Sequence, residues 1–260
     1  MPKLTATFIT MFKQPVASWL DSSIIARAQE QGVLKCYVES VLESLAFDHH
    51  AADDTPYGGG PGELMKIDVI APLIHQVLGR NQKLHRDKKR VLLMDPGGLP
   101  FSQAHAKRLL HFDELIFVCG RYEGIDARIH HYVDEAISIG DYVLSSGDLA
   151  AMVIFDSVAR MTEGVLGNYE SCRLESHSDG RLESSQYTRP SVFQGFLVPE
   201  IFQNGNHQAI AKERLKEAAY KTKSLRPDLL LQFPLTTEEM EAVTELEQAA
   251  LSYPWMKLHE

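Results

Sequence analysis

Hydrophobic positions along the first 165 residues alternate between two periods. Thr5–Phe12 is a β-branched and aromatic run that predicts a strand, whereas Pro15–Glu30 has apolar residues at helical intervals and ends before Gly32. Similar patterns predict strands at 34–41, 90–94, 114–119 and 133–139, and helices at 67–78, 102–110, 125–132 and 149–161. Strands that alternate with helices predict an α/β domain with a mostly parallel sheet over residues 1–165.

The pattern changes in two places. Residues 49–62 contain four glycines and two prolines without hydrophobic periodicity, which predicts a long loop; His49 and His50 at its start are interpreted as surface histidines. Residues 166–190 are polar and predict a flexible linker loop that carries catalytic residues. From 191 to 260 helical patterns return at 207–223 and 236–251, which predicts a small all-α C-terminal domain.

Composition and cysteine content narrow the protein class. A chain of 260 residues with 44% hydrophobic residues is ordinary for a globular protein. It has neither the apolar run of about 20 residues that spans a bilayer nor the features of a signal peptide. Three widely spaced cysteines, Cys36, Cys119 and Cys172, argue against a disulfide framework and a zinc site. We therefore expect a cytoplasmic protein that does not bind membranes.

The distribution of charge matters more than its total. A net charge of −9 does not by itself suggest a nucleic-acid partner. Between 212 and 226, however, six basic residues accompany only two acidic ones, Glu213 and Glu217, and a smaller basic cluster occupies 86–90. Such a stretch is either a solvated helix face or a surface that binds phosphates.

Three glycine-containing turns follow predicted strands, at 95–99, 119–124 and 139–147. Because ligands of open α/β sheets bind beyond the carboxyl ends of the strands, these turns predict one shared pocket, although each could be only a tight turn. They match neither the phosphate-binding GxxxxGK[ST] pattern nor the dinucleotide-binding GxGxxG pattern. The pattern favours a ligand without phosphates, held by backbone groups and apolar side chains.

Five segments carry a family resemblance: DDTPYGGGPG at 53–62, CGRYEGID at 119–126, SIGDYVLS at 138–145, GVLGN at 164–168 and YTRP at 187–190. In order and spacing the chain resembles the bacterial tRNA (guanine-N1-)-methyltransferases over residues 1 to about 235. The resemblance implies a SPOUT-type fold with a deep trefoil knot near 91–147. It also implies a homodimer, S-adenosylmethionine bound in a bent form, and support from Mg²⁺. The expected reaction is methylation of N1 of guanosine 37 in tRNA when another guanosine precedes it.

Methylation of guanine N1 requires removal of the N1 proton and stabilisation of negative charge on O6. The resemblance places the O6-stabilising arginine at Arg160. It places the general base at Glu175, where the family has aspartate; a second family aspartate is Glu183 here. Glu175 is the predicted base and Asp179 the alternative, and we assign no metal ligands.

The resemblance also implies binding residues. The backbone of the Ile139–Leu144 turn would hold the adenine between the side chains of Tyr142 and Leu144, and Glu123 would face the cationic end of the methyl donor. The expected cofactor-binding residues are Pro96, Gly98, Gly120, Tyr122, Glu123, Ile139, Gly140, Asp141, Tyr142, Val143, Leu144 and Gly147. The expected tRNA-binding residues are Tyr57, Gly59, Arg189, Lys212, Arg214 and Lys216.

Some positions depart from the family pattern. Ser146 stands where a second glycine is usual, and Asp95 and Gly97 replace serine and glutamine. Two other interpretations stay open: a knotted methyltransferase that acts on another RNA base or on ribose, and an inactive RNA-binding relative, since glutamate replaces the family aspartate at 175 and 183.

Overall fold

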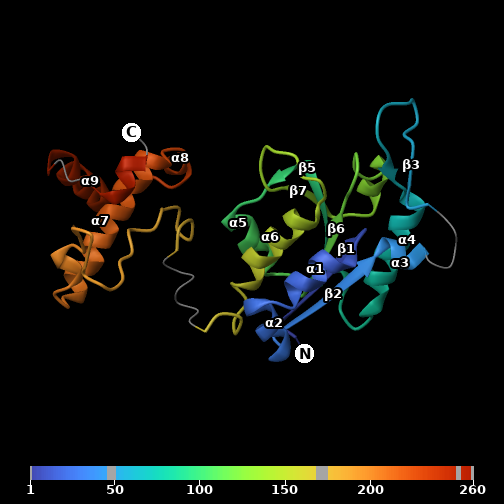
Figure 1. Ribbon diagram of the computed structural model, residues 1–260, viewed down its shortest axis with the longest axis horizontal. Helices are drawn as coiled ribbons and strands as arrows, with labels where there is room; N and C mark the ends of the chain where they lie inside the picture. Colours follow the sequence, from blue (N-terminus) through green and yellow to red (C-terminus); the bar gives the residue numbers. More distant parts are fainter. Residues whose placement is uncertain (1, 46–50, 168–174, 250–252, 259–260) are drawn as a thin grey trace. The chain divides into compact units, whose positions relative to one another are not determined.

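The computed structural model describes residues 2–45, 51–167, 175–249 and 253–258 of the chain (Figure 1). His49, His50 and Cys172 lie outside the described residues. The chain forms two compact units, Met1–Tyr169 and Glu170–Glu260. The division into three parts at 165 and 190 stays a prediction.

A five-stranded sheet in the order β2-β1-β6-β5-β7 forms the centre of the first unit. All neighbouring strands are parallel, which confirms the predicted α/β class. The strands are β1 (Leu4–Thr10), β2 (Leu34–Ser40), β5 (Lys89–Pro100), β6 (Glu114–Cys119) and β7 (Glu135–Ser138). A two-stranded ribbon, β3 (Asp53–Asp54) with β4 (Leu64–Met65), closes the base of the loop predicted at 49–62.

Helices cover both faces of this sheet (Figure 1). They are α1 (Lys13–Leu20), α2 (Ser23–Glu30), α3 (Val41–Leu45), α4 (Ile67–Arg80), α5 (Gln103–Leu109) and α6 (Asp148–Ala159), with the 3-10 helices η1 (Arg86–Lys88) and η2 (Ala127–His131). Alternate residues of β6 point to opposite faces: Leu115 and Phe117 pack with α1, α2, α5 and α6, whereas Ile116 and Val118 pack with α3 and α4. The fully buried sheet thus explains the continuous apolar strands.

The single helix predicted over Pro15–Glu30 is wrong, because the chain breaks between α1 and α2. Ser22 is extended and donates its hydroxyl to the Trp19 carbonyl, and Ser23 has a φ of 54°. Apolar residues keep nearly the same period on both sides of the break, so periodicity could not reveal it. The helix predicted at 125–132 is instead the 3-10 helix η2, where the Asp126 carboxylate accepts the Arg128 N–H.

The predicted strand 90–94 is too short, because β5 continues to Pro100 through the expected Pro96–Gly98 turn. Asp95 accepts the Gly97 N–H at 2.7 Å, and pairing with β7 then resumes at Leu99 after a register shift. A Cβ on Gly98 would lie 2.4 Å from the backbone nitrogen of Ile137. This glycine therefore permits close packing of two strands instead of ending one.

The basic cluster at 86–90 serves the fold. Lys89 is buried and donates to the carbonyls of Leu78 (2.7 Å) and Asn81 (2.8 Å), with Glu114 at 3.5 Å. Arg86 and Arg90 pair with Asp134 and Glu135 respectively. These charges are satisfied inside the unit.

The second unit contains α7 (His207–Leu225), α8 (Leu229–Gln232), α9 (Thr237–Ala249) and the 3-10 helices η4 (Glu200–Phe202) and η5 (Pro254–Leu258). Ala219 of α7 and Val243 and Leu246 of α9 are buried where these two helices pack together. The purely helical prediction for 191–260 is wrong at one place, since β8 (Val192–Phe193) and β9 (Phe196–Leu197) form a hairpin. Its turn, Gln194-Gly195, has φ values of 49° and 85°, as tight hairpins require.

Candidate functional site

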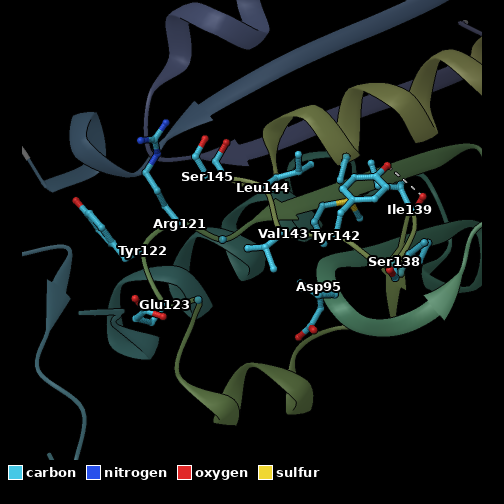
Figure 2. Close-up of a pocket in the computed structure, with 18 of the residues that line it drawn as sticks. Asp95, Arg121, Tyr122, Glu123, Ser138, Ile139, Tyr142, Val143, Leu144 and Ser145 are labelled. Carbon is cyan, nitrogen blue, oxygen red and sulfur yellow. Dashed lines mark hydrogen bonds between the residues drawn. The ribbon is translucent and has the colours of Figure 1, made fainter. Parts of the chain in front are cut away.

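The three glycine-containing turns meet at one cavity beyond the carboxyl ends of β5, β6 and β7 (Figure 2). Arg121, Tyr122 and Glu123 line one side, and Ile139, Tyr142 and Leu144 line the other. The cavity has a volume of about 200 Å³, is partly open to solvent, and has more apolar than polar surface. The parallel sheet therefore brings the three turns, which are far apart in the sequence, to one place.

Gly147 lets two of these turns approach each other. Its N–H donates to the Gly120 carbonyl at 2.8 Å, and Arg121 forms a β-bridge with Ser146. A Cβ on Gly147 would lie 2.8 Å from the Met94 Cβ and 3.0 Å from the Cys119 Cα. The backbone of the 139–147 turn can therefore reach the end of β6 only with glycine here.

The 139–144 turn has a special backbone conformation as well. Gly140 has a φ of 143°, and a Cβ there would lie 2.7 Å from Cε1 of Tyr142. The Tyr142 hydroxyl donates to the Ile139 carbonyl at 3.3 Å (Figure 2). Residues Tyr142 and Val143 of this turn are 54% and 85% exposed, which leaves apolar surface open at the cavity.

Ten of the twelve expected cofactor-binding residues line the cavity: Pro96, Gly120, Tyr122, Glu123, Ile139, Gly140, Tyr142, Val143, Leu144 and Gly147. Gly98 does not, because it packs against β7, and Asp141 is exposed outside the lining. The sequence prediction omitted Arg121, Ser138 and Ser145, which also line it. All three lie within the segments that carry the family resemblance, and this position in the sequence could have identified them as lining residues.

Arg121 brings positive charge to the cavity. Its guanidinium lies 4.6 Å from the ring centroid of Phe12, a cation–π contact. Its Nε is buried and has no hydrogen-bond partner among the described residues. On the same side, Gly62 approaches the Glu123 side chain so closely that a Cβ would lie 2.4 Å from its Cγ. The glycine-rich loop 53–62 therefore borders the cavity at Glu123.

A buried carboxylate is hydrogen-bonded to the 139–147 turn. Asp148, at the start of α6, is 5% exposed and accepts the hydroxyls of Thr10 (2.6 Å) and Ser146 (3.0 Å). Burial and the nearby Asp148 raise the pKa of the Cys119 thiol well above its ordinary value, which keeps that thiol neutral. The unusual Ser146 thus has a partner, so its hydroxyl ties the 139–147 turn to β1 through Asp148.

The expected catalytic residues lie in different units. Arg160 follows α6 directly and donates its backbone N–H to the Asp156 carbonyl at 3.0 Å. Glu175 and Asp179 lie in the second unit. Glu175 is half-buried, and its carbonyl accepts the Ser178 N–H at 3.1 Å. Asp179 is exposed and accepts the Arg181 N–H at 3.1 Å.

The expected tRNA-binding residues also divide between the units. Tyr57 is fully exposed, and Gly59 has a φ of 76° in the same loop. In the second unit, Arg189 and Arg214 line another cavity. Lys212 is exposed on α7.

The basic stretch 212–226 is partly neutralised. Lys216 lies 2.5 Å from a Glu245 carboxylate oxygen, and Lys223 lies 2.8 Å from Glu247. Arg226 pairs with Asp228. The acidic α9 therefore offsets much of the positive charge of α7, which supports the solvated-face interpretation for Lys216.

Within the described ranges, no three histidine, cysteine, aspartate or glutamate side chains gather in a way that could hold a metal ion. No helix described there is long and apolar enough to cross a membrane.

Comparison with known proteins gives a consistent result. The family model described as tRNA (guanine-1)-methyltransferase TrmD matches residues 4–232. A tRNA (guanine-N(1)-)-methyltransferase of Symbiobacterium thermophilum is 45% identical, covering 90% of this chain and 95% of the relative. Enzymes with the same name from Syntrophotalea carbinolica (41% identical, covering 93% and 96%) and Brevibacillus brevis (42%, covering 92% and 96%) are also similar.

Proposed function

This chain belongs to the tRNA (guanine-1)-methyltransferase family, and from that membership we infer that it transfers a methyl group from S-adenosylmethionine to N1 of a guanosine in tRNA. We propose that the cavity beyond β5, β6 and β7 holds the methyl donor. The observation that supports this most is the meeting of three glycine-containing turns at one largely apolar cavity. An adenine ring fits between apolar walls, whereas phosphate groups would require more hydrogen-bond donors.

The charges around the cavity support the same assignment. S-adenosylmethionine carries a positive sulfonium and an amino acid tail, and Glu123 and Arg121 on one side of the cavity could pair with the ammonium and carboxylate of that tail. The volume of about 200 Å³ is below the roughly 300 Å³ at which small-molecule sites begin, so the ligand would extend through the open mouth. We expect the exposed Tyr142 and Val143 to cover part of it.

We propose in addition that the chain is knotted between 91 and 147. Support comes from the path after β7: this strand lies at the edge beside β5, yet the following turn reaches back to β6, where Gly147 donates to Gly120. The extension of β5 to Pro100 pairs with β7 along the way. Because knots are rare, an experimental structure traced through this region is the direct test.

The base of the reaction is proposed to be Glu175. Guanine N1 becomes nucleophilic only after losing its proton, and a carboxylate can accept that proton while a guanidinium stabilises the charge on O6. Glu175 is proposed ahead of Asp179 because it stands at the position where the family resemblance places the general base. Arg160 is proposed as the O6 partner. Among the described residues nothing forms a metal site, so no step is assigned to Mg²⁺.

Glu175→Gln tests this assignment, with Asp179→Asn as the matched control. We expect Glu175→Gln to lower turnover about 10²- to 10⁴-fold, as loss of a general base does. Titration calorimetry should show unchanged binding of S-adenosylmethionine. Asp179→Asn should retain most activity. If Asp179→Asn is the inactive variant and Glu175→Gln is not, the base is Asp179.

The proposed substrate is tRNA with guanosine at position 37 preceded by another guanosine, in the cytoplasm. Methyl transfer to unmodified transcripts that differ only at these positions, followed by nucleoside analysis, tests the preference. Formation of 1-methylguanosine is the expected product. Binding of tRNA without any transfer would instead indicate an inactive relative.

A homodimer is proposed because α6 leaves an apolar face next to the cavity turn. Leu149 and Val153, one helical turn apart, are 53% and 47% exposed. Light scattering after size exclusion should give twice the chain mass of 29.2 kDa. Val153→Glu should shift the protein to the monomer, since it would place charge in the apolar contact.

A further inference from the structure

The second unit contains a larger cavity that the methyl-transfer site does not use. Its volume is about 730 Å³, within the range of small-molecule sites. It lies between the 185–191 segment and the region from η4 to the first half of α7. Every lining residue belongs to this unit, so the cavity does not depend on how the two units are arranged.

Aromatic rings form one wall of this cavity. Tyr187 and Phe202 have ring centroids 5.4 Å apart at an interplanar angle of 36°, and both rings are half-buried. The guanidinium of Arg214 lies 5.9 Å from the Phe202 centroid. Paired aromatic rings with an arginine beside them offer flat surfaces on which a nucleobase can stack.

Two arginines bring unneutralised charge to the same cavity. Within the described part of the chain, neither Arg189 nor Arg214 forms an ion pair, and both are exposed. Lys216 and Lys223, farther along α7, are each paired with a glutamate. In a chain with a net charge of −9, two arginines without carboxylate partners at one cavity favour an anionic ligand.

A buried network fixes the segment that carries Tyr187. Glu217 is 1% exposed and accepts the Ser185 hydroxyl and the Trp255 indole N–H, the latter at 3.1 Å. Ser185 lines the cavity, and burial together with the charge of Glu217 raises the pKa of Tyr187. Tyr187 is therefore a neutral ring in a wall that is already ordered, which lowers the entropy cost of binding a ligand against it.

We propose that this cavity binds one unpaired nucleotide of the tRNA substrate. Its base stacks on the Tyr187–Phe202 wall, and its phosphate binds Arg189 and Arg214. Only an unpaired nucleotide can expose its base face to protein rings in this way. The inference rests on the proposed function, because it takes tRNA as the substrate.

Two substitutions separate the parts of this subsite. Phe202→Leu keeps an apolar side chain of similar size but removes the ring, and Arg214→Gln removes one charge. We expect each to raise the Kd for tRNA about five- to a hundredfold, the range that corresponds to loss of one stacked base or one charged contact. Affinity for S-adenosylmethionine should stay unchanged, since its proposed cavity lies in the first unit.

The salt dependence of tRNA binding distinguishes stacking from charge. Arg214→Gln should reduce the slope of log Kd against log salt by about 0.7 to 0.9, which corresponds to one phosphate contact. Phe202→Leu should leave that slope unchanged. Phe202→Tyr, which keeps an aromatic ring, should retain the affinity of the unsubstituted chain for tRNA. Arg27→Gln, which removes an exposed cation from α2, serves as the control. It should change the Kd for tRNA and the salt slope less than Arg214→Gln does.

The outcomes divide clearly. Circular dichroism and the Tm of each variant establish that it folds. If folded Phe202→Leu and Arg214→Gln both bind tRNA within twofold of the unsubstituted chain, the subsite is refuted. If the unsubstituted chain itself neither binds nor methylates tRNA, the proposed function fails instead. A Kd that rises equally for Arg27→Gln and Arg214→Gln would show general electrostatics and also refute the subsite.

Discussion

Arg181 attaches the segment that carries Glu175 to the helices of the second unit. Its guanidinium donates from Nε and Nη2 to the two carboxylate oxygens of Glu239, at 2.8 and 2.9 Å. The same group donates to the carbonyls of Phe233 (2.8 Å) and Pro234 (2.9 Å). The Arg181 and Glu239 side chains are 13% and 11% exposed. Arg181→Met would remove all four bonds while keeping an unbranched apolar side chain.

The expected cost follows from the carboxylate left behind. Arg181 is the main reason that the pKa of Glu239 falls from 4.5 to about 2. At about 1.4 kcal/mol per unit, this depression contributes at most about 3 kcal/mol to the free energy of unfolding at pH 7. The contribution is complete above pH 4.5 and disappears as pH falls towards 2. In Arg181→Met the pKa of Glu239 rises, so the loss of stability should be at most about 3 kcal/mol at pH 7 and clearly smaller at pH 3.

Urea unfolding followed by tryptophan fluorescence measures this loss. The chain has two tryptophans, so a Trp19→Phe background leaves Trp255 as the reporter of the second unit. Arg226→Met is the control, because Arg226 and Asp228 form a solvent-exposed pair that contributes little to stability. Adding Glu239→Met to Arg181→Met should recover stability, since no charge then stays buried. A cost below 1 kcal/mol at pH 7, or an equal cost at pH 3, would refute the reasoning.

Three further predictions concern the first unit. Gly98→Ala should destabilise it by about 1–3 kcal/mol in thermal unfolding, because its Cβ would meet Ile137, while Gly97→Ala, with its nearest contact at 3.3 Å, should not. Lys89→Met should cost about 3–5 kcal/mol, since it leaves Glu114 buried without its cation; a Tm equal to that of the unsubstituted chain would contradict this. Burial raises the pKa of Cys36 to about 12, so roughly one thiol in 10⁴ is ionised at pH 8. Iodoacetamide should therefore label Cys36 much more slowly in the native protein than in urea, and equal rates would show that the thiol is not shielded.

The amino-acid sequence determined the features that depend on neighbouring residues. The strand predicted at 114–119 is β6 without adjustment, because every one of its residues is buried and apolar runs of this length favour strands. The helix predicted at 102–110 is α5, and the Ser102 hydroxyl at its start accepts the His105 N–H. The three glycine-containing turns also stood out, since glycine after a strand allows close approach of the backbone.

Tertiary structure decided which of these residues have distant partners. Asp148 accepts the hydroxyl of Thr10, 138 residues away in the sequence, and also that of the unusual Ser146. No local pattern could show that Ser146 is linked to β1 in this way. The basic clusters at 86–90 and 212–226 looked alike in the sequence, yet the first is satisfied inside the fold. In the second, Lys216, Lys223 and Arg226 pair with acidic neighbours, whereas Arg214 lines the second cavity. A charge pattern records only the order of residues along the chain. Whether a cation binds a carboxylate, a carbonyl or a ligand depends on which strands and helices pack against it, and that is settled only when the chain folds.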